Sequence, residues 1–216
     1  MPIRGIIFDL DGTLLDTLGD IAAAVNAGRR AMGLPEWPVS DIKQWIGEGM
    51  PILCQRALID APHVPVEQML PIVSEYYAAH RLDQAAPYPG IPELLDALTA
   101  RGIPMAILSN KPHVHTLPMA QAVFAKWSFV AIEGYRLEEF RKPDPRGALQ
   151  IAATMQAAPA DVALVGDSDT DMRTAVNAGM VPVGATWGYR SRDVILAAGA
   201  RHLIDTPAEI LDLLDT

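Results

Sequence analysis

The chain has 216 residues and 50% of them are hydrophobic, so it can bury a sizeable core but is short for two full domains. Its net charge of −9 argues against a nucleic-acid-binding surface, which would carry a basic patch. The single cysteine, Cys54, excludes an intramolecular disulfide and is expected to be a packed thiol. We find neither a signal-peptide pattern nor the run of about 20 apolar residues that a membrane span needs, and we expect a cytoplasmic protein with no membrane partner.

The first predicted strand ends in two aspartates. Residues 6–8 are apolar and indicate a short buried strand, and Asp9 and Asp11 follow where it should end. Carboxylates are costly there unless they are paired or bind a metal, and ligands of open α/β sheets bind outside the carboxyl ends of strands. An ordinary turn would also use Asp and Gly. The stretch therefore favours a catalytic or metal-binding site over a simple turn.

Residues 14–84 carry helical patterns and no convincing strand. Apolar residues near a 3.6-residue period predict a helix over 14–34 and another over 66–82. Between them, a helix from Ser40 breaks at residues 47–49 and then continues. We therefore expect a separate helical domain over residues 16–85, inserted after the first strand.

From residue 86 onward, predicted strands and helices alternate. The further strands are expected at 104–108, 129–132, 162–166 and 181–184. The helices are expected at 93–100, 113–123, 146–155, 172–178 and 209–214. This alternation indicates an α/β fold with a Rossmann-like, doubly wound parallel sheet. Residues 1–15 and 86–216 are expected to form this core domain.

Polar residues fall at the same end of three predicted strands. Asp9 and Asp11 end the first, Ser109 and Asn110 end another, and residues 167–171 end a third. Right-handed crossovers place these ends on one edge of a parallel sheet. An ordinary turn can account for polar residues at the end of one strand. It does not account for polar residues at three strand ends on the same edge of a sheet, so the sequence predicts a functional site at this edge.

The residues at this edge suit a hard metal ion and phosphoryl chemistry. Its four carboxylates belong to Asp9, Asp11, Asp167 and Asp171. They need a cation, and an all-oxygen set of ligands fits Mg²⁺. An aspartate beside Mg²⁺ can attack phosphorus, while a second carboxylate two residues on can move a proton. Lys142, in a proline-flanked turn, and Ser109 can hold the transferring phosphoryl group.

The order and spacing of four motifs resemble those of the haloacid dehalogenase superfamily. They are Asp9-Leu-Asp11-Gly-Thr13, Ser109-Asn110, Lys142-Pro143 and Gly166-Asp167-Ser168-x-x-Asp171. The helical segment after the first motif resembles that superfamily's C1-type cap. The resemblance implies the same fold that the strand pattern predicts.

The resemblance also implies a role for each acidic residue. Asp9 would be the nucleophile and a Mg²⁺ ligand. Asp11 would be the general acid and base and would bind Mg²⁺ through its backbone carbonyl. Asp167 would be a further ligand, and Asp171 would support the metal directly or through water.

Phosphate and substrate binding is implied for residues outside the acidic set. Ser109, Asn110 and Lys142 would bind the phosphoryl group or the substrate, and Lys142 would also neutralise Asp9. Thr13 would position the attacking water or a phosphoryl oxygen. Gly47 and Gly49 would belong to a cap loop that closes over the substrate, although a plain turn between helices would also use them.

Within the superfamily, the chain resembles bacterial phosphoglycolate phosphatases most. The resembling stretches are residues 15–17, 45–49, 88–90, 109–112 and 187–189. The implied partner is a small phosphorylated metabolite, 2-phosphoglycolate, and the implied state is a monomer or homodimer. Glu48 departs from what a carboxylate-bearing substrate favours. Lys43, Arg56 or Lys111 would offset its charge.

Three other functions stay open at this point. A phosphatase of wider range would act on sugar phosphates, nucleotides or pyrophosphate. A mutase resembling β-phosphoglucomutase would share the motifs but protect its phosphorylated aspartate from water. A catalytically idle phosphate-binding module would be favoured by loss of a motif residue, and none is missing.

Overall fold

In the computed structural model, which describes residues 3–214, the chain packs into two compact units. Asp16–Ala86 forms one unit, and the described residues up to Leu15 and from Pro87 onward form the other. Across the described range, no helix combines the length and the apolar character that crossing a membrane requires.

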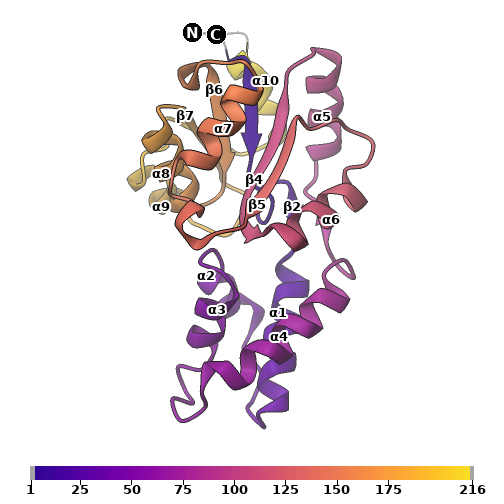
Figure 1. The fold of residues 1–216 in the computed structure, drawn as a ribbon, viewed down its shortest axis with the longest axis vertical. Coiled ribbons are helices and arrows are strands. Elements are labelled where there is room, and N and C mark those ends of the chain that lie inside the picture. Colours follow the sequence, from indigo (N-terminus) through magenta and orange to yellow (C-terminus); the bar gives the residue numbers. More distant parts are fainter. Residues whose placement is uncertain (1–2, 215–216) are drawn as a thin grey trace. The chain divides into compact units, whose positions relative to one another are not determined.

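The larger unit is built on a parallel sheet (Figure 1). Its six strands run in the order β5-β4-β1-β6-β7-β8, and each neighbouring pair is parallel. The strands are β1 (Gly5–Phe8), β4 (Met105–Pro112), β5 (Ala131–Tyr135), β6 (Val162–Gly166), β7 (Val181–Ala185) and β8 (His202–Ile204). The predicted α/β class and doubly wound parallel sheet are confirmed.

Helices alternate with these strands, as a parallel sheet requires. They are α5 (Ile91–Ala100), α6 (His113–Val123), α7 (Arg146–Thr154), α8 (Asp169–Ala178), α9 (Arg192–Ala197) and α10 (Ile210–Leu214). Short 3₁₀ turns occur at Glu138–Phe140, Pro159–Asp161 and Pro207–Glu209.

Strand β1 is buried on both faces, which explains its continuous apolar run. Ile7 belongs to a core cluster that includes Ile151 of α7 and Ala175 of α8. Side chains alternate along a strand, so Ile6 and Phe8 lie on the opposite face, and both are fully buried there. The residue that follows Phe8 is thus held on a strand that packing fixes from two sides.

The smaller unit contains four helices, α1 (Leu18–Ala31), α2 (Val39–Trp45), α3 (Met50–Ala57) and α4 (Val66–His80). A Cβ added to Gly28 of α1 would lie 2.5 Å from Cγ2 of Val73 in α4. Glycine at this position therefore lets the two longest helices of the unit approach closely.

Arg29 of α1 is the buried polar centre of this helical unit. Its side chain is 1% exposed. Its Nε donates to the Pro35 carbonyl at 2.6 Å, its two terminal nitrogens donate to the Asp60 carboxylate at 2.8 and 2.7 Å, and one of them also donates to the Ala57 carbonyl. The Arg29 side chain therefore links the end of α1 to the segment before α2, to the last residue of α3 and to the segment after α3.

Replacing Arg29 with methionine is expected to lower the free energy of unfolding by about 2–4 kcal/mol, because two carbonyls lose their donor in a buried place. Urea unfolding followed by tryptophan fluorescence measures this change. Arg30→Met is the matched control, since the side chain of Arg30 is 52% exposed and pairs with Glu36 at the surface. Equal losses for the two variants would contradict the importance assigned to the buried contacts.

Several elements of the chain differ from the sequence-based prediction. The expectation of no strand over residues 14–84 was wrong, because β2 (Leu15–Asp16) pairs with β3 (Ala86–Pro87). Strand β8 and helix α9 were not predicted, and β5 begins two residues later than expected. Strands of two or three residues are too short to show a period of two, so no sequence pattern marks them.

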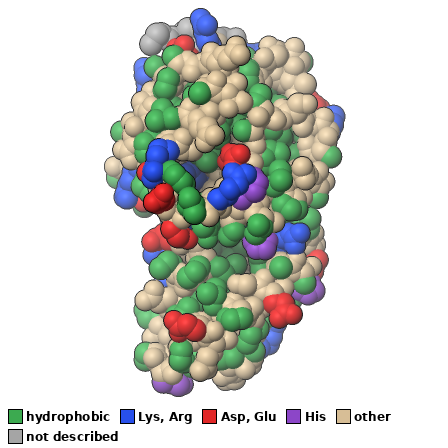
Figure 2. All heavy atoms as spheres, viewed as in Figure 1, with side chains coloured by type: hydrophobic (Ala, Val, Ile, Leu, Met, Phe, Trp, Pro, Cys, Tyr) green, Lys and Arg blue, Asp and Glu red, His purple; other side chains and the backbone are tan. Residues whose placement is uncertain are grey.

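Charged side chains of both signs are dispersed on the face drawn in Figure 2. Lys and Arg side chains of the described residues are separated there by apolar, acidic and other atoms, and they form no continuous basic patch on this face.

Candidate active site

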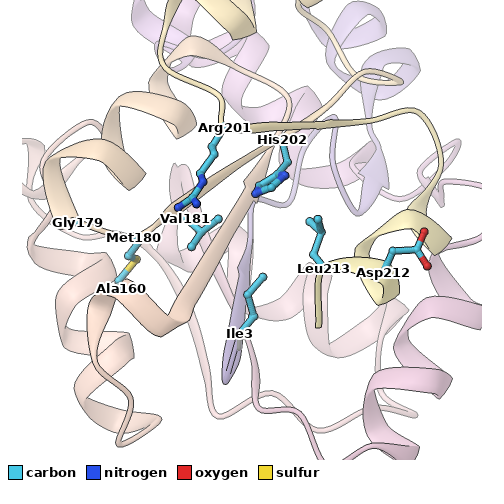
Figure 3. A pocket seen from close by; sticks show the side chains of 9 residues that line it. All are labelled: Ile3, Ala160, Gly179, Met180, Val181, Arg201, His202, Asp212 and Leu213. Carbon is cyan, nitrogen blue, oxygen red and sulfur yellow. The ribbon is translucent and has the colours of Figure 1, made fainter. Parts of the chain in front are cut away.

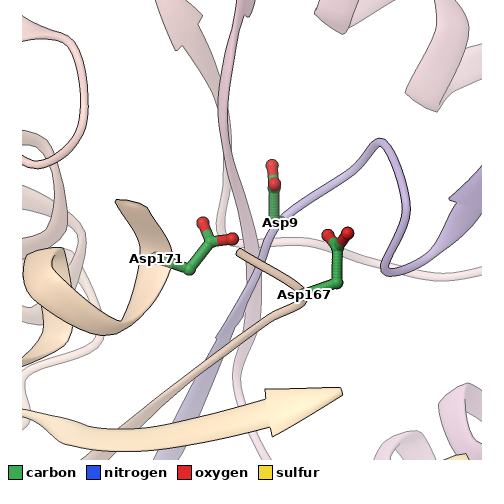
Figure 4. A group of neighbouring side chains, drawn as sticks. All are labelled: Asp9, Asp167 and Asp171. Carbon is green, nitrogen blue, oxygen red and sulfur yellow. The ribbon is translucent and has the colours of Figure 1, made fainter. Parts of the chain in front are cut away.

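Three aspartates converge at the carboxyl edge of the sheet. Asp9 follows β1, Asp167 follows β6, and Asp171 lies in the first turn of α8. One carboxylate oxygen from each lies within 4.8 Å of the others. Figure 4 shows the three side chains as neighbours that come from these separate elements, with their carboxylates on the same side. The predicted meeting of strand ends on one edge is therefore present.

Lys142 lies among these carboxylates. Its Nζ is 2.5 Å from Asp171 Oδ1 and 3.0 Å from Asp9 Oδ1, and its side chain is only 3% exposed. The loop that carries it is held by Asn110, whose Nδ2 donates to the Lys142 carbonyl at 3.0 Å and whose Oδ1 accepts from the Lys142 N–H at 2.7 Å. In this structure the Asn110 amide therefore positions Lys142.

The buried carboxylates have perturbed pKa values. Burial, and then the neighbouring Asp171, raise the pKa of Asp9 from 3.8 to about 8. The same two causes raise the pKa of Asp167 to about 7. Burial by itself would lower the pKa of Lys142, but Asp171 and Asp9 outweigh it and raise that pKa. The cluster therefore has more negative charge than one lysine can offset.

A divalent cation fits this cluster. Its donors are three carboxylates without nitrogen or sulfur ligands, which suits a hard ion such as Mg²⁺. The excess negative charge also indicates a bound cation, because buried carboxylates require either a charged partner or a metal ion. The side chain of Asp11 is not one of these three donors. Its Oδ1 lies 2.6 Å from Lys111 Nζ, and its charge adds to the causes that raise the pKa of Asp9. The predicted metal contact of Asp11 through its backbone stays a prediction.

Asp167 is held by hydrogen bonds from two distant segments. The Thr13 hydroxyl donates to its Oδ1 at 2.9 Å, and the Tyr189 N–H donates to its Oδ2 at 2.7 Å. Trp187 Nε1 in turn donates to the Thr13 carbonyl at 3.0 Å. A Cβ on Gly188 would lie 2.2 Å from Asp167 Cβ, so only glycine fits there. Sequence reasoning did not place residues 187–189 in the site, although their resemblance to a family turn could have indicated it.

Asp171 is oriented by local sequence. It is the third residue of α8 and forms a capping box with Ser168, whose Oγ accepts from the Asp171 N–H at 3.3 Å. The Ser168 N–H donates back to Asp171 Oδ2 at 3.1 Å. A Cβ on Gly166 would lie 2.3 Å from Asp171 Cβ, which explains the glycine that ends β6. The Gly-Asp-Ser-x-x-Asp pattern thus sets the direction of both carboxylates.

The remaining predicted residues lie in two places. Ser109 and Asn110 do not end their strand as predicted, because β4 continues to Pro112. Ser109 is 3% exposed, and its Oγ accepts from the Lys111 N–H at 3.2 Å. Gly47 and Gly49 belong to the helical unit, between α2 and α3, with φ values of 123° and 84°. The substrate contacts predicted for Ser109, Thr13 and the two glycines stay predictions.

A cavity elsewhere in the larger unit does not belong to this site (Figure 3). Its lining includes Ile3, which precedes β1, and Val181 and His202, which begin β7 and β8. These positions lie at the amino edge of the parallel sheet, opposite to the acidic cluster. We therefore place the chemistry at the carboxyl edge.

Comparison with known proteins points to one family. The sequence matches the model of the haloacid dehalogenase-like hydrolases over residues 3–179. It is 33% identical over 215 residues to the phosphoglycolate phosphatase of Escherichia coli (strain K12), covering 89% of this chain and 85% of that protein. Identity to the phosphoglycolate phosphatase of Chromobacterium violaceum is 30%, with 98% and 96% covered.

A solved structure agrees with these relatives. The structure of a predicted phosphoglycolate phosphatase from Haemophilus somnus matches with a TM-score of 0.90 at 29% identity. The match covers 98% of this chain and 97% of that one.

Proposed function

Because the chain belongs to the haloacid dehalogenase-like hydrolases and is a phosphatase, we propose that it hydrolyses 2-phosphoglycolate to glycolate and phosphate. The observation that carries this proposal is the position of Asp9, beside Lys142 and within the group of three carboxylates at the end of β1. The phosphoglycolate phosphatases of two bacteria, similar over most of this chain, support the choice of substrate. The expected cytoplasmic location and monomeric or homodimeric state stay predictions.

In the first step, a carboxylate oxygen of Asp9 attacks phosphorus. The P–O bond to glycolate breaks, and the phosphoryl group is left on Asp9 as an aspartyl-phosphate. Lys142, 3.0 Å from Asp9 Oδ1, favours the ionised nucleophile and offsets charge on the phosphoryl oxygens. Bound Mg²⁺ would be held by Asp9, Asp167, Asp171 and the Asp11 carbonyl, and would neutralise charge as the phosphoryl group transfers.

Asp11 moves the proton in both steps. Its side chain gives a proton to the glycolate oxygen as the first P–O bond breaks. It then takes a proton from a water whose oxygen attacks phosphorus, which breaks the bond to Asp9 and releases phosphate. The Asp11 side chain is 16% exposed, whereas the Asp171 side chain is fully buried, so Asp11 is the more accessible to water and to a leaving group.

We propose that residues 16–85 act as a cap and that the loop with Gly47 and Gly49 closes over the substrate. Both glycines have a positive φ, which L side chains rarely adopt, so this loop depends on them. Arg56 donates to the Glu48 carboxylate and, at 2.9 Å, to the Trp45 carbonyl. Arg56 thus offsets the Glu48 charge that argues against a carboxylate-bearing substrate.

A substrate panel with Mg²⁺ tests the proposed reaction. We expect 2-phosphoglycolate to exceed glucose 6-phosphate, a nucleoside monophosphate and pyrophosphate in kcat/KM by at least about tenfold, the ratio that 1.4 kcal/mol of discrimination gives. Phosphate release measures each rate. If a sugar phosphate or a nucleotide has the highest kcat/KM of the panel, the protein is instead a phosphatase of wider range. Conversion of β-glucose 1-phosphate to glucose 6-phosphate without free phosphate would favour the mutase.

A further inference from the structure

Lys111 is a second buried lysine at this edge of the sheet. Its side chain is 7% exposed, and its Nζ lies 2.6 Å from Asp11 Oδ1 and 3.6 Å from Met119 Sδ. Burial of an ammonium group is costly even when the group is paired. The two steps proposed above use Lys142 for the phosphoryl group and assign nothing to Lys111. Its placement beside the proton-transferring Asp11 therefore needs its own explanation.

Several elements fix the backbone of Lys111. The β4–β5 pairing has an irregularity between Ser109 and Pro112, and such irregularities re-aim side chains near active sites. The Lys111 carbonyl accepts from the buried Thr116 hydroxyl at 3.1 Å. A Cβ on Gly134 of β5 would lie 2.4 Å from the same carbonyl, so glycine permits this approach. These contacts therefore hold in place the backbone from which the Lys111 side chain extends.

The chemistry of the leaving group brings the substrate within reach of Lys111. Asp11 protonates the glycolate oxygen, so one of its carboxylate oxygens must come within about 3 Å of that atom. The Lys111 ammonium is already in contact with Oδ1 of the same carboxylate. In 2-phosphoglycolate the carboxylate carbon is two bonds from the glycolate oxygen. A substrate in reach of Asp11 thus brings its own carboxylate close to Lys111.

We propose that Lys111 is a specificity-determining residue that binds the carboxylate of the leaving group, an inference that rests on the proposed hydrolysis by Asp9 and Asp11. The Lys111 ammonium donates to Asp11 Oδ1 at 2.6 Å and to Met119 Sδ at 3.6 Å. A thioether sulfur is a weak acceptor, so a substrate carboxylate can replace the contact with Met119 while Lys111 keeps its contact with Asp11. The class selected is a phosphomonoester whose ester carbon carries a carboxylate. Arg56, another of the cations named in the sequence analysis as offsetting the Glu48 charge, pairs directly with Glu48 in the helical unit.

A pair of matched substrates tests the assignment. The first is 2-phosphoglycolate, and the second is its neutral isostere with a carboxamide in place of the carboxylate. We expect the wild-type protein to favour the carboxylate by roughly 10- to 100-fold in kcat/KM, and Lys111→Met to bring this ratio to about one. Lys126→Met is the matched control, because Lys126 is 66% exposed and pairs with Asp96 at the surface. It should leave the ratio unchanged.

Several results would overturn the assignment. Equal losses on both substrates in Lys111→Met would mean that Lys111 acts only through Asp11. Lys111→Arg keeps a cation and is expected to keep a preference for the carboxylate, and loss of that preference would contradict our reading even if Lys111→Met failed to fold. A wild-type protein that hydrolyses both substrates equally would overturn the role of Lys111 alone. Hydrolysis of the isostere but not of 2-phosphoglycolate would overturn the proposed substrate as well.

Discussion

Replacing Asp9 with asparagine is expected to abolish phosphate release from 2-phosphoglycolate, with kcat lower by at least about 10⁴-fold. A neutral amide oxygen is a poor nucleophile, and no aspartyl-phosphate can form on it. Steady-state phosphate release measures the loss, and acid-quenched protein incubated with substrate should carry phosphate on wild type but not on the variant.

The same substitution should leave the fold intact. Asp9 is held at a raised pKa among like charges, so removing its charge relieves repulsion, and Lys142 keeps its 2.5 Å contact with Asp171. We expect the metal-free variant at pH 8 to melt no lower than wild type. Asp96→Asn changes a surface carboxylate and is the control for activity. Substantial turnover by a well-folded Asp9→Asn variant would rule out the covalent route.

Removing Mg²⁺ with EDTA is expected to lower turnover by at least about 10³-fold, and added Mg²⁺ should restore it. Without a cation, the pKa of Asp9 is about 8, so much of the nucleophile holds a proton at neutral pH. Phosphate release before and after chelation measures the effect. Full activity in protein shown by elemental analysis to be metal-free would contradict the metal assignment.

Mg²⁺ should also bind more tightly as pH rises. The folded-state pKa values of Asp9 and Asp167, about 8 and about 7, lie above the ordinary 3.8, so the metal-free folded protein retains protons that the unfolded chain releases. Its stability therefore falls as pH rises from about 4 to about 8. Mg²⁺ must displace these protons, so the rise in Tm that it produces should be larger at pH 8.5 than at pH 5.5. A shift independent of pH would contradict this linkage.

Much of the larger unit could be predicted because its signals are local. Strand β1 is buried on both faces and is therefore apolar throughout, and Asp9 stands out where that run ends. The capping box of Ser168 and Asp171 likewise depends only on residues within a stretch of four. Strand β8 and the β2–β3 pair could not be predicted, because their stability comes from neighbouring strands and not from a pattern of their own.

The sequence by itself determined the parallel α/β fold and the edge on which the polar residues meet. Periodicity, strand burial and the right-handed crossover are enough for these, because each follows from local chemistry or from a general rule of chain topology. The roles of Asp9, Lys142 and Asp167 were predicted from charge balance and from the resemblance of their motifs to those of a family. Only the tertiary structure decided which side chain partners which. It placed the Asn110 amide on the Lys142 backbone and Lys111 on Asp11. Such contacts join residues 32 and 100 positions apart, and no local pattern encodes them.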